Sequence, residues 1–201
     1  MKNSNRFKQL EERIDFLRNN LLPQSKINGD YSDLEQDLTR SFVLLVHAEI
    51  ENYLEDRVEE KVNTSFNSWK TNRKRSNVIA SINAFCNHDL DTGGKHTKSN
   101  KQNIEYRLNL NIQKYKSIIY TNHGIKRDNI IDLLLPLGIE INDIDDTWLS
   151  IMDNFGSNRG LIAHKKHTIQ LMIDPKTVLN DVYLNILPEL KQIDLKLIKV
   201  T

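Results

Sequence analysis

The sequence has few of the residues that interrupt regular structure or link distant segments covalently. It contains one cysteine, Cys86, which excludes an internal disulfide and a metal site built from several cysteines. Only seven glycines and four prolines occur among its 201 residues. Such a chain keeps long uninterrupted stretches, which favours helices over many short strands.

An excess of charge of one sign and long apolar runs are also absent. The chain has 28 basic and 27 acidic residues, so it has no overall positive field, and any nucleic-acid site has to be a local patch. The apolar runs are short, and Asp132 interrupts the one at residues 130–137, so no transmembrane helix is expected. Residues 1–21 lack the apolar segment of a signal peptide. We therefore expect a soluble, cytoplasmic protein with no membrane partner.

Apolar residues recur at intervals of three or four over most of the chain, which predicts amphipathic helices. The first helix should end before Pro23. The second should begin at a capping box formed by Ser32 and Glu35, and its apolar stripe extends to Val58. A shorter helix is predicted at residues 66–85.

Turn residues separate further helical patterns in the C-terminal half. The polar stretch at residues 88–103 is predicted to be a loop. Gly156 is expected to break one helix, so that Ser157 or Asn158 caps the next, and Pro188 is expected to kink the last helix. Strand-like alternation is nearly absent. The sequence therefore predicts one all-α domain over residues 1–201, a single bundle of about six or seven helices.

One segment carries a pattern with catalytic chemistry, because Arg159 is followed after four residues by His164. An imidazole with a pKa near 6.5 can take the proton of a ribose 2′-hydroxyl at neutral pH. A guanidinium can hold the scissile phosphate with two parallel hydrogen bonds. RNA carries its own nucleophile, so such a site needs no metal and no other cofactor. The same spacing also occurs often by chance on protein surfaces.

Two regions of the chain resemble the HEPN superfamily and, within it, the bacterial RiboL-PSP-HEPN branch. One is Asn158 with the Arg159–His164 motif, and the other is the helical stretch at residues 42–54, FVLLVHAEIENYL. The order of helices and the length are similar over almost the whole chain. The resemblance implies an all-α homodimer that cleaves RNA without metal, leaving a cyclic phosphate. It also implies a toxin–antitoxin or antiviral defence setting, with an antitoxin or another defence-system protein as a candidate partner.

The sequence departs from the family pattern at two positions. A polar residue, often Asn, commonly follows the catalytic arginine, and here that position is Gly160 while Asn158 precedes the arginine. Some HEPN toxins carry a tyrosine two residues after the histidine, where an antitoxin modifies them, and here that residue is Lys166. Two alternatives therefore stay open. One is a non-catalytic HEPN domain that binds RNA, a nucleotide or a protein, and the other is a helical interaction module.

Acidic residues on the second predicted helix are candidates for a supporting role. Glu51 is expected beside Arg159, where a carboxylate would orient the guanidinium, and Glu49 is the competing candidate. A solvated acidic helix face would give the same pattern.

Basic residues directly after the motif are candidate RNA contacts. Lys165, Lys166 and His167 extend the positive charge next to His164. A solvated helix end that interacts favourably with the helix dipole is an equally good interpretation. The remaining histidines show no metal-ligand spacing, so no metal site is expected, and His47 is expected in the core or at an interface.

Overall fold

The fold is entirely helical in the part of the chain that the computed structural model describes, residues 2–86, 103–164 and 172–200. Its elements are α1 (Asn5–Leu21), α2 (Asp33–Asn72), α3 (Asn77–Phe85), α4 (Ile104–Thr121), α5 (Arg127–Leu134), the 3₁₀ turns η2 (Leu135–Leu137) and η3 (Ile141–Asp143), α6 (Asp146–His164), α7 (Pro175–Asn180), the π-helical segment η5 (Asp181–Ile186) and α8 (Leu187–Lys199). Because α7, η5 and α8 run on without interruption, the described ranges contain seven continuous helices and no strand. The prediction of an all-α bundle of six or seven helices is confirmed.

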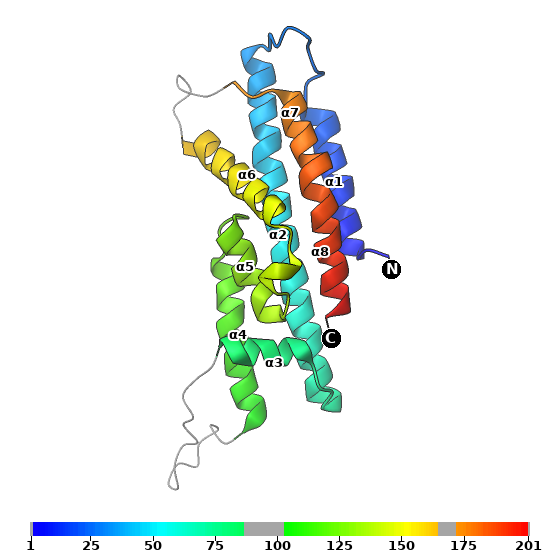
Figure 1. The fold of residues 1–201 in the computed structure, drawn as a ribbon, viewed down its shortest axis with the longest axis vertical. Helices are drawn as coiled ribbons and strands as arrows, with labels where there is room; N and C mark the ends of the chain where they lie inside the picture. Colours follow the sequence, from blue (N-terminus) through cyan, green and yellow to red (C-terminus); the bar gives the residue numbers. More distant parts are fainter. Residues whose placement is uncertain (1, 87–102, 165–171, 201) are drawn as a thin grey trace.

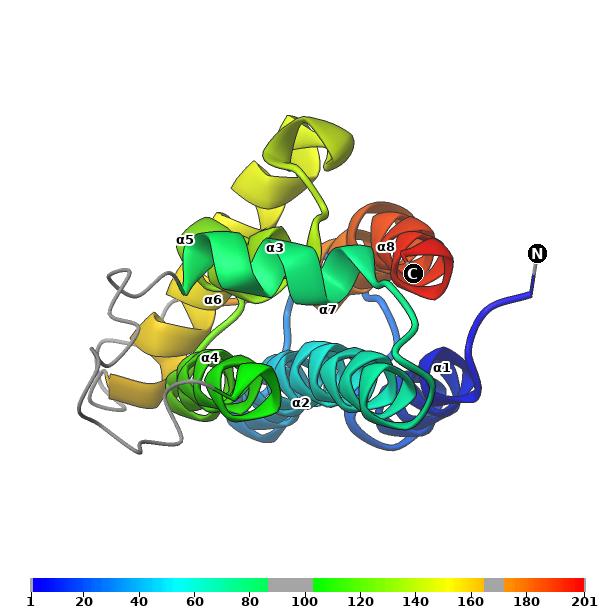
Figure 2. The same ribbon diagram turned by 90° about the horizontal axis from the view of Figure 1, so that it is seen from below.

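The helices form two layers, and the long helix α2 lies in the middle of one of them. Figure 1 shows α2 running the length of the molecule, with α1 antiparallel to it, α6 crossing it diagonally and α3 lying across its C-terminal end. Seen along that axis, α4, α2 and α1 form one layer, and α3, α5 and α8 lie in the other (Figure 2). None of the helices in the described ranges is both long and apolar enough to cross a membrane.

Helix α2 begins as the sequence predicts and ends later. Glu35 accepts a hydrogen bond from the Ser32 backbone N–H at 2.7 Å, and Ser32 Oγ accepts one from the Glu35 N–H, so the predicted capping box is present. The helix then continues past Val58 to Asn72, so the start predicted at residue 66 for the next helix is wrong. That helix, α3, begins at Asn77 and ends at Phe85, where the sequence predicts its end. Neither glycine nor proline occurs between Val58 and Asn72, and buried Val62 extends the apolar face. The chain turns instead at Arg73, which has a left-handed conformation.

A buried carboxylate joins the N-terminus, α2 and α8. Asp194 of α8 is fully buried and accepts hydrogen bonds from Tyr53 Oη at 2.9 Å and Arg57 Nε at 3.0 Å, both on α2. It also accepts bonds from the backbone N–H and hydroxyl of Ser4, each at 2.7 Å. Such a buried charge is tolerated only when its lone pairs are satisfied, as they are here.

Gly156 does not break a helix, because α6 is continuous from Asp146 to His164. The predicted helix start at Ser157 or Asn158 is therefore wrong. Gly156 is buried, and a Cβ atom at this position would lie 2.9 Å from Lys126 Cγ, closer than real Cβ contacts. The glycine permits close packing of α6 against the start of α5, and neighbouring helical residues maintain the helix through it.

The helix before Pro188 widens into the π segment η5, where the sequence predicts a kink. The backbone N–H of Leu187 donates to the carbonyl of Val182, five residues back. Proline lacks an N–H and its ring clashes with the carbonyl four residues earlier, so a local change of helix type before Pro188 is expected. Trp148 of α6 donates its indole N–H to the Ile186 carbonyl at 3.1 Å and thereby ties α6 to this segment.

Candidate functional site

The start of α6 is fixed by a cap and a buried aromatic side chain. Asp145 Oδ1 accepts a hydrogen bond from the Trp148 backbone N–H at 2.7 Å, which satisfies a donor at the helix start. Trp148 is 2% exposed and belongs to the hydrophobic core. These contacts fix the position of α6, and therefore of Arg159, three turns further along the same helix.

Helix α6 packs on α2 through two rings. Phe155 of α6 stacks on His47 of α2 with centroids 6.5 Å apart and planes 14° apart. His47 is 3% exposed, so its predicted place in the core is confirmed. Its Nδ1 atom lies 3.6 Å from a Glu51 carboxylate oxygen and has no hydrogen-bond partner in the described ranges. Burial, together with the charge of Arg159, lowers the pKa of His47 to about 4, so the ring is neutral at pH 7.

The charge of Arg159 affects side chains on the face of α2 that carries His47. Arg159 is half-buried on α6, and its charge lowers the pKa of both His47 and Glu51. For Glu51, burial and the neighbouring charge of Glu55 raise the pKa above its usual value, against the lowering effect of Arg159. His47, Glu51 and Glu55 are four residues apart, so they share one face of α2. The face that meets Arg159 therefore carries one neutral imidazole and two carboxyl groups.

The turn between α4 and α5 completes the surroundings of Glu51. The charge of His123 and a hydrogen bond from the Gly124 backbone also lower the pKa of Glu51. Asn122 donates to Glu55 Oε1 at 2.8 Å and to the Gly124 carbonyl at 3.0 Å, which fixes the turn against α2. We call His47, Glu51, Glu55, His123 and Arg159 the Arg159 cluster.

The predicted site residues are only partly brought together. Glu51 belongs to the Arg159 cluster, whereas Glu49 pairs with Arg13 of α1 at 3.0 Å. Asn158 is exposed and lines a pocket beside the cluster. His164 is the last residue of α6. Lys165, Lys166 and His167 lie outside the described residues.

The cluster also contains residues that the sequence prediction did not assign to a site. His47 was expected only as a core or interface residue, and His123 only as a histidine without metal-ligand spacing. The four-residue spacing of His47, Glu51 and Glu55 is a signal in the sequence for a shared polar face. The position of His123 could not be predicted in this way, because it depends on how the turn after α4 packs on α2.

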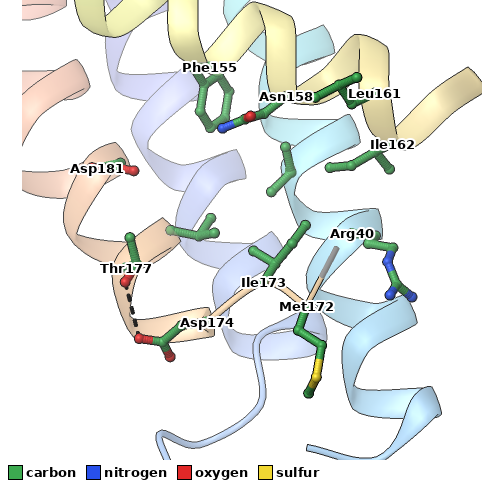
Figure 3. A pocket seen from close by; sticks show the side chains of 12 residues that line it. Arg40, Phe155, Asn158, Leu161, Ile162, Met172, Ile173, Asp174, Thr177 and Asp181 are labelled. Atoms are coloured by element: carbon green, nitrogen blue, oxygen red, sulfur yellow. Dashed lines mark hydrogen bonds between the residues drawn. The ribbon is translucent and has the colours of Figure 1, made fainter. Parts of the chain in front are cut away.

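A pocket of about 270 Å³ opens beside the motif, between α2, α6 and the start of α7 (Figure 3). Phe155, Asn158, Leu161 and Ile162 of α6 line it, so one face of the helix segment that carries Arg159 forms one of its walls. Arg40 lines it from α2. Within the described ranges, no three or more His, Cys, Asp or Glu side chains are grouped so that they could hold a metal ion.

The helical bundle and the Arg159 motif on its α6 helix define a protein of the HEPN class. The chain belongs to the RiboL-PSP-HEPN family, whose model matches residues 4–194. The resemblance drawn from the sequence is thereby confirmed, and the family is generally one of ribonucleases. No curated protein matches the chain. No solved structure matches it either.

Proposed function

We propose that this protein is a metal-independent endoribonuclease in which Arg159 and His164 are the catalytic residues. The observation that carries the proposal is the position of Arg159. Arg159 is half-buried, and its charge acts to lower the pKa of His47 and of Glu51 on α2, whereas an arginine without such a role is usually solvated. A carboxylate neighbour restricts the orientation of a guanidinium and prepares it to bind a phosphate.

The reaction is a transesterification within the RNA. The 2′-hydroxyl oxygen attacks the adjacent phosphorus, and the bond from phosphorus to the 5′-oxygen of the next nucleotide breaks. His164 takes the 2′-hydroxyl proton, and the leaving 5′-oxygen ends protonated. The products are a 2′,3′-cyclic phosphate and a 5′-hydroxyl. Arg159 binds the phosphate oxygens and stabilises the charge that develops on them.

A homodimer is part of the proposal. Because α6 is one continuous helix, positions 159 and 164 are about 140° apart around its axis. A site in which one copy supplies Arg159 and its partner supplies His164 overcomes this separation. The family resemblance implies a dimer with two Arg–His pairs near a shared axis, and such a dimer would bring the residues of the two copies into one cleft. It also supports a toxin–antitoxin or antiviral defence setting.

The test compares RNA cleavage by the wild type, Arg159→Ala and His164→Ala, each with and without EDTA. Arg13→Ala is the matched control, because Arg13 is exposed and pairs with Glu49 away from the cluster. We expect both site variants to lose about a hundredfold or more in rate, and we expect the control and the chelator to have no effect. Activity that disappears with EDTA would show that the metal-independent mechanism is wrong.

A second candidate is a HEPN domain that binds RNA, a nucleotide or a protein without cutting RNA. Gly160 favours it, because the family commonly has a polar residue at this position. RNA binding by the wild type, with no cleavage under any condition of the same test, would establish this second function.

A further inference from the structure

The pocket between α2, α6 and α7 combines apolar walls with a few polar groups, which is typical of a site for a small flat ligand. Val43, Phe155, Ile162, Ile173 and Val178 supply apolar surface, and Asn158 supplies an amide (Figure 3). Phe155 and Val43 are 5% and 2% exposed, so these walls are held by the core. The volume of about 270 Å³ suits one ring system and its substituents.

The charges around the pocket disfavour an anion. The lining includes one basic side chain, Arg40, and two acidic ones, Asp174 and Asp181. Arg40 already pairs with Asp37 at 2.7 Å. Asp174 caps α7: its carboxylate accepts hydrogen bonds from Thr177 Oγ1, from the Lys176 backbone N–H and from Tyr31 Oη, so it is already occupied. Asp181 Oδ1 accepts one hydrogen bond, from Asn185 at 3.2 Å, so the Asp181 carboxylate retains oxygen lone pairs for further donors. The pocket therefore suits a neutral ligand that has N–H groups.

Two features connect the pocket with the motif. Asn158 and Ile162 both line the pocket. Asn158 directly precedes Arg159 in α6 and Ile162 follows three residues after it, so a group in the pocket lies beside the catalytic segment of α6. Phe155 lines the pocket and also stacks on His47, which belongs to the Arg159 cluster.

The pocket also meets an irregular segment, because Asp181 is the first residue of the π segment η5. Such segments inside α-helices are frequent at functional sites.

We propose that this pocket binds one nucleobase of the RNA, next to the phosphate that Arg159 holds. The proposal rests on the function proposed above and adds a base-binding subsite to it. A nucleobase is neutral and flat, its faces suit the apolar walls, and its edge donors suit Asp181. This carboxylate favours bases with an exocyclic amino group, namely adenine, cytosine and guanine, over uracil.

The direct test is a titration of the whole protein, with its isoleucine and methionine methyl groups isotopically labelled, by each of the four nucleosides. We expect adenosine, cytidine or guanosine to shift the NMR signals of Ile162, Ile173 and Met172, which line the pocket. The core residues Ile130 and Ile193 serve as internal controls. Inorganic phosphate should leave the pocket signals unchanged. If none of the nucleosides shifts the pocket signals, or if phosphate alone does, the proposal is overturned.

A matched pair of variants on α7 tests the role of the pocket in cleavage. Thr177 is exposed and lines the pocket, whereas Asn180 is exposed on the same helix and does not line it. We expect Thr177→Trp to abolish the nucleoside shifts and to raise the KM for RNA about tenfold, the size of one lost base contact, without changing kcat. Asn180→Trp should match the wild type. If Thr177→Trp folds, as its melting curve would show, and still gives the wild-type shifts, the pocket is not the base site.

A second variant avoids the bulky substitution. Asp181→Asn keeps the size of the side chain and removes its charge, so we expect weaker preference for amino-bearing nucleosides over uridine. An unchanged preference would overturn the role of Asp181. The titration requires no cleavage, so its failure is distinct from failure of the nuclease proposal. Nucleoside shifts in a protein that cuts no RNA would leave the pocket assignment standing and would refute the catalytic proposal alone.

Discussion

Phe155 of α6 stacks on His47 of α2 with ring centroids 6.5 Å apart, so a residue that lines the pocket contacts a residue of the Arg159 cluster. The contact keeps a titratable ring out of water, beside an arginine. Burial and the charge of Arg159 lower the pKa of His47 to about 4. The pair therefore makes the stability of the α2–α6 interface depend on pH.

The first prediction concerns His47→Gln and acid stability. The pKa of His47 is about 4 in the folded protein and about 6.5 in the unfolded chain. Because the folded value is the lower one, its contribution is full above pH 6.5 and is lost as the pH falls towards 4. At pH 5 the wild type should have lost about 2 kcal/mol of unfolding free energy from this group.

Urea denaturation at pH 7.5 and pH 5 measures this effect. The Gln variant cannot take up a proton, so its unfolding free energy should fall less between these two pH values. An equal decrease in both proteins would show that His47 does not titrate as an isolated buried group.

The second prediction separates Glu51 from Glu49. Glu51 belongs to the Arg159 cluster, and Glu49 pairs with Arg13 of α1. Glu51→Gln should lower kcat for RNA cleavage about tenfold or more, because it removes the charge that orients the guanidinium. Its KM should change little. Glu49→Gln serves as the matched control and should keep the wild-type kcat, and equal losses in the two variants would contradict a positioning role for Glu51.

The third prediction concerns the buried carboxylate on α8. Asp194 is fully buried and receives hydrogen bonds from Tyr53, Arg57 and Ser4. Asp194→Asn leaves the buried Arg57 without this charged partner, and should lower the free energy of unfolding by about 3 kcal/mol or more. Asp56→Asn is the control, since Asp56 forms an exposed pair with Arg6 and should cost less than about 1 kcal/mol. Chemical denaturation of the two variants tests the difference, and similar losses would refute it.

The fourth prediction concerns Gly160, the position where the family commonly has a polar residue. Among the described residues, and apart from the backbone of its own helix, no atom would lie within 4 Å of a Cβ placed there, and the residue is inside α6. Gly160→Ala should therefore stabilise the protein by about 0.5–1 kcal/mol through helix propensity. Gly156→Ala is the contrasting variant, because its Cβ would meet Lys126, and it should gain less. Thermal unfolding ranks the two, and a destabilised Gly160→Ala would show that the site needs the glycine.

The fifth prediction tests the shared site. Arg159→Ala and His164→Ala should each be inactive as separate preparations. When the two are unfolded, mixed and refolded together, a mixed dimer contains one site with both residues intact, and partial cleavage activity should return. A mixture that stays inactive, in a protein shown to be a dimer, would contradict a site built from two copies.

Local sequence features predicted the helical class and several helix ends. The capping box of Ser32 and Glu35 acts over three residues, and the apolar spacing acts over a few turns, so neither needs the rest of the fold. The same reasoning was wrong at Gly156 and between α2 and α3. At Gly156 the close approach of Lys126 explains why the helix accepts a glycine, and a residue so distant in sequence is invisible to a local pattern.

The Arg159–His164 motif and the family resemblance were evident from the sequence, because residue identity and spacing define them. The partners of Arg159 required the tertiary structure. His47, Glu51 and His123 come from α2 and from the turn after α4, and their effects on one another depend on distance and burial across helix interfaces. The sequence by itself therefore determined the helical class and the family, and the packing of α6 on α2 decided which side chains surround Arg159 and where the pocket beside it opens.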